Sequence, residues 1–219
     1  MAGLITGLEP EAVRAATARV REEIDAAARR AGRDPAEVEL LAAVKYIPLE
    51  ELGVVAAAGL TLVGENRAQE LEAKAAAHPE LRWHFIGQLQ SRKVKQILPH
   101  VELIHSVASD SALRQLEQHG RADTEILVEV NVAGEEGKAG IAPEELGAFI
   151  ERAPVRVSGL MTMPPFSDVA EDSRRHFAAL RQLAGSHGLT RLSMGTSQDF
   201  GVAVEEGATI VRIGSRLYA

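Results

Sequence analysis

The chain has 219 residues, a formal net charge of −7 and no cysteine. The acidic balance argues against a surface that neutralises a nucleic-acid backbone, and the lack of cysteine excludes disulfides, thiolate metal sites and a catalytic thiol. The start MAGLITGLEPEAV lacks the pattern of a secretory signal, and no later segment supplies about 18 uninterrupted apolar residues. We therefore expect a cytoplasmic, single-domain protein over residues 1–219, without nucleic-acid or membrane partners.

The first predicted element is an amphipathic helix over residues 9–30. Its apolar positions recur at spacings of three and four, at Val13, Ala16, Val20, Ile24 and Ala27. Gly32 is expected to end it.

Short apolar runs and helical patterns then alternate to the end of the chain. In chain order they are strand 38–44, helix 49–58, strand 60–64, helix 66–77, strand 81–87, helix 92–98, strand 103–107, helix 109–119, strand 124–132, helix 143–152, strand 155–161, helix 169–187, strand 190–194, helix 200–206 and strand 208–214. Such alternation is typical of a doubly wound open sheet or a closed barrel. Eight strand units in this length favour an α/β fold of the (β/α)8 TIM-barrel type, with the extra first helix capping one end or packing outside.

A lysine directly follows the first predicted strand. In a barrel the C-terminal ends of the strands form the functional face, so Lys45, after LLAAV, would project into the mouth. There the loss of hydration favours the neutral amine, which can attack an aldehyde and form an imine. The alternative is a lysine that reaches from a strand end to solvent.

The segment LSMGTSQDF predicts a second part of the same site. It places Gly195, Thr196 and Ser197 between a strand and a helix, where backbone N–H groups and hydroxyls converge on a phosphate. The alternative is an ordinary turn in which Asp199 caps the next helix.

The last predicted strand ends in RIGS and adds to this phosphate site. Gly214 permits close backbone approach and Ser215 offers a hydroxyl. Arg212 lies two residues before Gly214 on the same face of the strand and so points inward, either to a ligand or to a structural salt bridge.

The remaining basic and imidazole groups have simpler interpretations. The sequence holds no helix-borne histidine pair, and we predict no metal site. His84 and His105 lie on adjacent predicted strands, where a buried, hydrogen-bonded role is expected ahead of a site role for His84. Arg92, Lys93 and Lys95 form a basic cluster that is expected to be a solvated helix face.

Taken together, these residues resemble the YggS/PROSC family of proteins that bind pyridoxal 5′-phosphate (PLP), which look like the N-terminal barrel of alanine racemase standing alone. The resemblance runs from about residue 39 to the C-terminus. It rests on LLAAVKY, GENRAQE, WHFIGQLQSRKVK, the HS of LIHSV, EVNVAGEEGKAG, GLMTMPP, LSMGTSQDF and VRIGSRLY.

The resemblance implies a role for each predicted site residue. Lys45 would be the Schiff-base lysine, Arg212 would face the pyridine nitrogen, and Asn66 and Met161 would line the ring. The phosphate would be held by Ser193, Gly195, Thr196, Ser197, Gly214 and Ser215.

Three positions depart from the family pattern, and two more have no assigned role. The family commonly has serine before and threonine after the lysine, where this chain has Val44 and Tyr46, and SMGMS reads SMGTS here. Lys138 and Gly140 fall on a loop after the fifth strand, with no role implied.

The function predicted from the sequence is PLP homeostasis: storage, buffering or delivery of the cofactor to PLP-requiring apoenzymes by a non-catalytic, monomeric protein. The chain keeps a cofactor site but shows no second group to move protons and no further domain to wall off a substrate. The alternatives are a PLP-dependent amino-acid racemase or related small PLP enzyme and, more distantly, a Schiff-base aldolase that uses Lys45 on a sugar phosphate.

Overall fold

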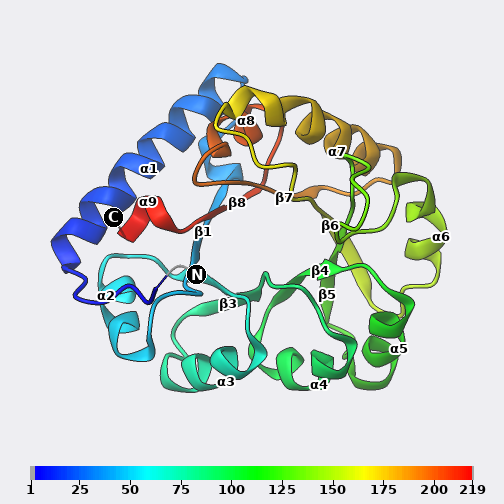
Figure 1. Cartoon of the computed structure of the whole chain (residues 1–219), viewed down its shortest axis with the longest axis horizontal. Helices are drawn as coiled ribbons and strands as arrows, with labels where there is room; N and C mark the ends of the chain where they lie inside the picture. The colour runs from blue at the N-terminus through cyan, green and yellow to red at the C-terminus, as the bar shows by residue number, and fades with distance from the viewer. Residues whose placement is uncertain (1–2, 219) are drawn as a thin grey trace.

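The computed structural model describes residues 3–218 and shows a closed barrel of parallel strands. Each strand pairs with the next in chain order, and β8 closes the ring against β1 (Figure 1). The strands are β1 (Glu39–Ala43), β2 (Leu62–Glu65), β3 (Arg82–Phe85), β4 (Leu103–Val107), β5 (Glu125–Glu129), β6 (Arg156–Met161), β7 (Arg191–Thr196) and β8 (Ile210–Ile213). The predicted (β/α)8 fold is confirmed.

Helices surround the barrel in chain order (Figure 1). They are α1 (Pro10–Arg30), α2 (Leu52–Ala57), α3 (Ala68–Ala77), α4 (Val94–Ile97), α5 (Asp110–His119), α6 (Leu146–Glu151), α7 (Arg174–Ser186), α8 (Phe200–Glu205) and α9 (Ser215–Tyr218). Because only the short α9 follows β8, the N-terminal α1 fills the outer ring between α8 and α2. Its five predicted apolar positions are all buried there, and it ends at Arg30, shortly before Gly32.

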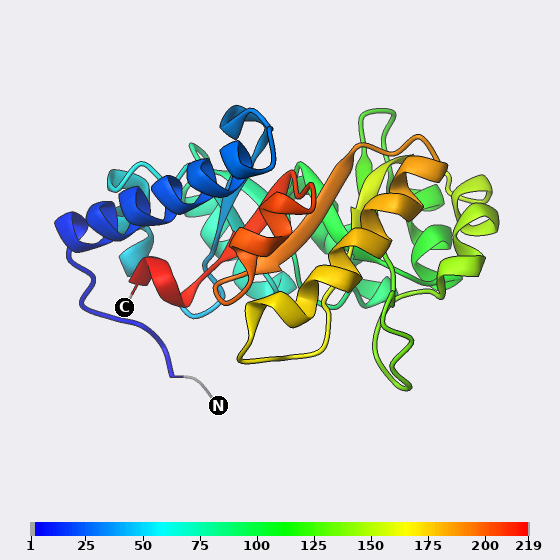
Figure 2. The same ribbon diagram turned by 90° about the horizontal axis from the view of Figure 1, so that it is seen from above.

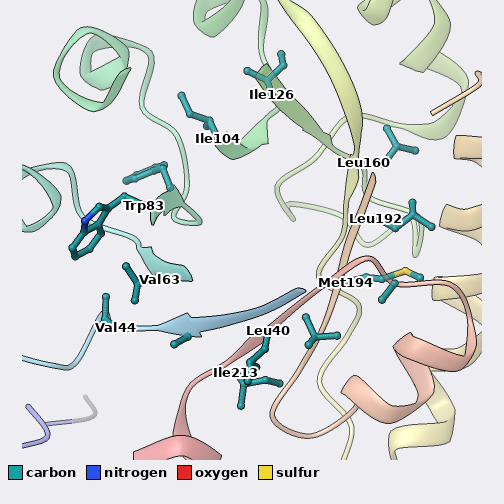
Figure 3. Close-up of a cluster of buried hydrophobic side chains, with 14 of the residues drawn as sticks. Leu40, Val44, Val63, Trp83, Ile104, Ile126, Leu160, Leu192, Met194 and Ile213 are labelled. Carbon is teal, nitrogen blue, oxygen red and sulfur yellow. The ribbon is translucent and has the colours of Figure 1, made fainter. Parts of the chain in front are cut away.

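The alternation of side chains along each strand separates two apolar clusters. Leu40 points outward to the helices, whereas its neighbour Leu41 points into the barrel. Figure 3 shows side chains of the outer cluster around the barrel. The inner cluster contains Leu41, Leu62, Leu103, Leu127, Met161 and Ile210.

Several element boundaries differ from those predicted, and the differences bear on the site. Strand β7 continues to Thr196, so the predicted phosphate-binding turn begins inside the strand. Strand β5 ends at Glu129, and the chain then forms a loop that returns at Ile141, where it pairs with Val130. Helix α9 was not predicted, and 3-10 turns at 49–51, 91–93, 143–145 and 170–173 begin or precede four of the expected helices.

One face of the barrel carries the segments that could enclose a ligand. The N-terminal segment and the loops after β5 and β6 all extend to the same side (Figure 2), which is the side where the strands end. Within residues 3–218, no helix is both long and apolar enough to span a membrane.

Candidate functional site

A cavity of about 450 Å³ opens on this face at the C-terminal ends of β1, β7 and β8. It brings together side chains that are far apart in the sequence, from the N-terminal segment to α9. Its lining consists of Gly3, Ile5, Ala43, Lys45, Tyr46, Ile86, Met163, Thr196, Ser197, Gln198, Arg212, Gly214, Ser215 and Tyr218.

Lys45 enters the cavity because β1 ends two residues before it. The N–H of Val44 still donates to the carbonyl of Gly64 on β2 at 2.9 Å, so the backbone stays fixed up to the residue before the lysine. The Lys45 ammonium lies 5.2 Å from the centre of the Tyr46 ring. It therefore lines the cavity, as predicted, and has an aromatic neighbour within the distance range of a cation–π contact.

A buried ion pair beneath the site ties the ends of β1 and β2 together. Lys74 of α3 donates to Glu65 Oε2 at 2.6 Å and to the carbonyl of Val44 at 3.0 Å. The other carboxylate oxygen of Glu65 accepts from the N–H groups of Asn66 at 2.6 Å and Arg67 at 3.1 Å. The position of Lys45 thus depends on a charge network that the strand pattern alone did not reveal.

Arg212 is a buried cation that is held by neutral groups. Its guanidinium donates to the Ser193 hydroxyl, to the carbonyl of Thr162 at 3.0 Å and to the sulfur of Met163 at 2.8 Å. No carboxylate within residues 3–218 lies within salt-bridge distance, so the structural salt bridge considered for it is absent from this part of the chain. Burial lowers the pKa of Arg212 to about 10, which leaves it charged at neutral pH.

A chain of hydrogen bonds runs from Arg212 across the barrel. Since arginine only donates, the Ser193 hydroxyl is free to donate to Nδ1 of His105, 2.8 Å away. His105 then carries its hydrogen on Nε2 and donates to Nδ1 of His84 at 3.0 Å, and the hydrogen of His84 lies on Nε2, 3.9 Å from Glu102 Oε2. This direction of donation fixes the tautomers of both rings.

Both imidazoles are neutral and buried, which confirms the core role predicted for them. Burial, with a smaller effect of nearby arginines, lowers the pKa of His84 to about 3 and lowers the pKa of His105 well below its ordinary value of 6.5. The chain of hydrogen bonds through Ser193, His105 and His84 therefore holds the Arg212 guanidinium in place without adding charge.

Gly195 and Thr196 have structural contacts in place of the predicted contacts with a phosphate. The N–H and hydroxyl of Thr196 donate to Asp199 Oδ1 at 2.7 and 3.2 Å, and Asp199 Oδ2 accepts from Ser173 at 2.9 Å. The Thr196 hydroxyl is thus already engaged within the protein, and the Asp199 carboxylate makes no cap to α8. Gly195 has a φ of 90°, and a Cβ there would lie 2.5 Å from the Cβ of Ala203, so glycine is required for packing against α8.

Ser197, Gly214 and Ser215 converge on the cavity from the ends of β7 and β8. The N–H of Gly214 donates to the Ser197 hydroxyl at 3.2 Å. A Cβ at Gly214 would meet only Ala43, with its nearest atoms at the ordinary contact distances of 3.6 and 3.7 Å, so the backbone here lies at the cavity without a close neighbour. An anion could occupy the cavity beside the hydroxyls and backbone amides.

Four predicted residues do not line this cavity, and one of them is Gly195, which packs against α8. Asn66 faces a neighbouring cavity, because β2 ends at Glu65 and the chain turns outward into α3. Met161 belongs to the packed inner cluster, and Ser193 lies beneath Arg212 as its hydrogen-bond acceptor. Their contribution to the site is indirect in this structure.

Some lining residues were not identified from the sequence. Met163 lies two residues after the end of β6, and that position was the available signal. Ile86 follows β3 directly but lay inside the predicted strand 81–87. Tyr218 comes from the unpredicted α9. Ile5 enters because its N–H donates to the carbonyl of Tyr46 at 2.8 Å, a contact that no local pattern indicates.

Lys138 lies away from these residues on the loop after β5, where it forms an ion pair with Glu135. Within residues 3–218, no group of three His, Asp or Glu side chains is placed to hold a metal ion.

Comparison with known proteins places the chain. The family model described as "Alanine racemase, N-terminal domain" matches residues 15–219. A pyridoxal phosphate homeostasis protein of Aquifex aeolicus is 42% identical over 215 residues, covering 91% of this chain and 94% of the relative. The chain belongs to the pyridoxal phosphate homeostasis protein family.

Other members support this membership. The pyridoxal phosphate homeostasis protein of Pseudomonas aeruginosa is also 42% identical, over 214 residues and 92% of each chain. Among solved structures, PipY of Synechococcus elongatus with PLP bound matches at a TM-score of 0.79 and 32% identity, covering 94% of this chain and all of PipY. The family, expected from the sequence motifs, is confirmed.

Proposed function

We propose that this chain binds PLP as a Schiff base on Lys45 and acts in intracellular PLP homeostasis, by storing, buffering or delivering the cofactor. The observation that carries the proposal is one cavity whose lining combines a lysine amine, a buried arginine with no carboxylate partner among residues 3–218, and the backbone of Gly214. The names of the relatives and the PLP-bound PipY structure support it.

The lining residues fit the chemical groups of the cofactor. Arg212 would donate to the pyridine nitrogen, since its guanidinium is buried without a carboxylate partner within residues 3–218. Ser197, Gly214 and Ser215 would hold the phosphate in the cavity at the ends of β7 and β8. Lys45 would supply the amine that condenses with the aldehyde.

The same residues favour a carrier over an enzyme. When bound, PLP supplies an electron sink for carbanions, and that sink is strongest when its ring nitrogen is protonated. A charged Arg212 disfavours that protonation because two positive charges would face each other. We therefore propose a non-catalytic role, with PLP-requiring apoenzymes as recipients and a monomer as the working form.

Absorbance and labelling of the purified protein test the cofactor site. The protein should show a visible imine band with PLP, and borohydride followed by peptide mapping should label Lys45. Lys45→Ala should lose the band and keep the fold, whereas the control Lys138→Ala, on a loop of the same face, should keep both. Stable label on another lysine with Lys45 unmodified would refute the assignment.

The carrier role needs a separate assay. Loaded protein is mixed with a PLP-requiring apoenzyme, and its reactivation is followed beside a free-PLP control. L-amino acids are incubated in parallel and D-isomers are measured by chiral chromatography. Turnover well above that of free PLP, lost in Lys45→Ala, would overturn the carrier proposal and favour the racemase alternative.

A further inference from the structure

A second cavity lies on the same face of the barrel, at the C-terminal ends of β2 and β3. Its volume is about 590 Å³, and it shares no lining residue with the cavity that contains Lys45. We call it the glutamine-lined cavity. Its lining consists of Asn66, Arg67, Ala68, Gln69, Phe85, Gln88, Gln90, Arg92, Lys93 and Gln96.

The glutamine-lined cavity gathers cations that the protein itself does not neutralise. Arg67, Arg92 and Lys93 have no carboxylate within salt-bridge distance in the described part of the chain, although the whole chain carries a net charge of −7. Arg92 approaches only the amide oxygen of Gln90, at 3.3 and 3.4 Å, and Lys93 donates to Gln96 at 3.1 Å. In an acidic protein rich in ion pairs, such a cluster favours an external anion.

The polar groups around these cations are suited to the same ligand. Glutamine amides can donate to oxygen atoms of an anion, and guanidinium groups bind carboxylate or phosphate through two parallel hydrogen bonds. Helix α3 begins at this cavity without a side-chain cap, which adds partial positive charge.

The sequence motifs point to the same place. GENRAQE and WHFIGQLQSRKVK are long motifs of the family resemblance, yet they contribute only Ile86 to the cavity of Lys45. Their polar residues instead converge on the glutamine-lined cavity, including Asn66, Gln69, Gln90 and Lys93. The cavity of Lys45 therefore gives no role to the polar residues that these motifs place around the glutamine-lined cavity.

We propose that the glutamine-lined cavity is a second ligand site, which binds a small organic anion bearing two or more phosphate or carboxylate groups. Three unpaired cations match a ligand of several negative charges, and the volume is that of a small-molecule site. The proposal is independent of the cofactor, because the two cavities have separate linings.

Calorimetric titration at constant ionic strength tests the proposal, with pyrophosphate and citrate as separate probes. We expect one saturable site for at least one probe in borohydride-reduced, PLP-loaded protein, and the same site in Lys45→Ala beside any binding at the vacant phosphate site. The stronger probe identifies the preferred class, phosphate or carboxylate. If a probe binds Lys45→Ala but not the PLP-loaded protein, the anion occupies the cofactor's phosphate site and the proposal is overturned. The absence of saturable binding of either probe would also overturn it.

Matched variants locate the binding. Arg92→Gln and Lys93→Gln should each weaken the probe by about tenfold or more, since each removes a charge-assisted hydrogen bond. Lys95→Gln is the control, because Lys95 is exposed on α4, directly after the 3-10 turn of Arg92 and Lys93, lies outside the lining and carries the same charge. An equal loss in Lys95→Gln would indicate non-specific attraction and refute the site. Unchanged melting temperatures would show that all three variants fold.

Discussion

Replacing Lys74 by methionine removes the cation that joins the ends of β1 and β2. The ammonium lies 2.6 Å from Glu65 Oε2 and 3.0 Å from the carbonyl oxygen of Val44, and both charged side chains are at most 2% exposed. Methionine fills a similar volume but leaves the Glu65 carboxylate buried without its cation. Because removing one partner of a buried pair costs about 3–5 kcal/mol, we expect the free energy of unfolding to fall by that amount.

Urea unfolding followed by circular dichroism measures this loss, and the melting temperature should fall by about 6–20 °C. Glu65→Gln keeps an oxygen that accepts from the Asn66 and Arg67 N–H groups. The double variant Glu65→Gln/Lys74→Met should therefore be more stable than Lys74→Met alone, with a coupling energy above about 1 kcal/mol. A loss below about 1 kcal/mol for Lys74→Met, or additive effects, would refute the reasoning.

The same variant should also weaken PLP binding, because Lys74 fixes the carbonyl of the residue that precedes Lys45. Leu71→Ala is the control, since Leu71 is fully buried on the same helix and its truncation costs about 2–5 kcal/mol without touching the ion pair. Absorbance titration at a temperature where both variants are folded should show weaker binding only in Lys74→Met. Equal weakening would mean that general stability, and not the position of Lys45, controls affinity.

Three further predictions follow from single sites. Gly214→Ala should keep the fold, since its Cβ would meet Ala43 at ordinary contact distances, but should weaken PLP more than pyridoxal; equal weakening of the two would argue against a phosphate site here. Gly195→Ala should destabilise the protein by about 1–3 kcal/mol in urea, because its φ is 90° and its Cβ would lie 2.5 Å from that of Ala203; an unchanged midpoint would contradict this. Burial keeps the pKa of His84 near 3 in the folded protein, so this ring gains a proton only on unfolding and its contribution to stability, present above pH 6.5, is lost on acidification. Between pH 7 and 5 this contribution to the free energy of unfolding falls by about 2 kcal/mol. The stability of His84→Gln should therefore fall by about 2 kcal/mol less than that of the unmodified protein over the same pH range. Identical stability profiles of the two proteins against pH would show that burial does not hold the ring neutral.

Local sequence patterns predicted the position of some site residues and not of others. Lys45, Arg212 and Gly214 were predicted from their positions at strand ends, because the C-terminal ends of all parallel strands meet on one face of a barrel. Asn66 has the same kind of position but faces the other cavity, since the chain turns outward at the end of β2. The Thr196 hydroxyl was predicted to bind the phosphate, yet it donates to Asp199.

The sequence by itself determined the alternation of strands and helices, the closed barrel and the face that carries the polar residues. These features follow from periodicity and chain order, which are properties of neighbouring residues. Only the tertiary structure decided which side chains share a cavity, how Lys74 anchors the residue before Lys45, and how two histidines hold Arg212. Those contacts join residues far apart in the chain, and they depend on strand register and loop path, on which local patterns carry no information.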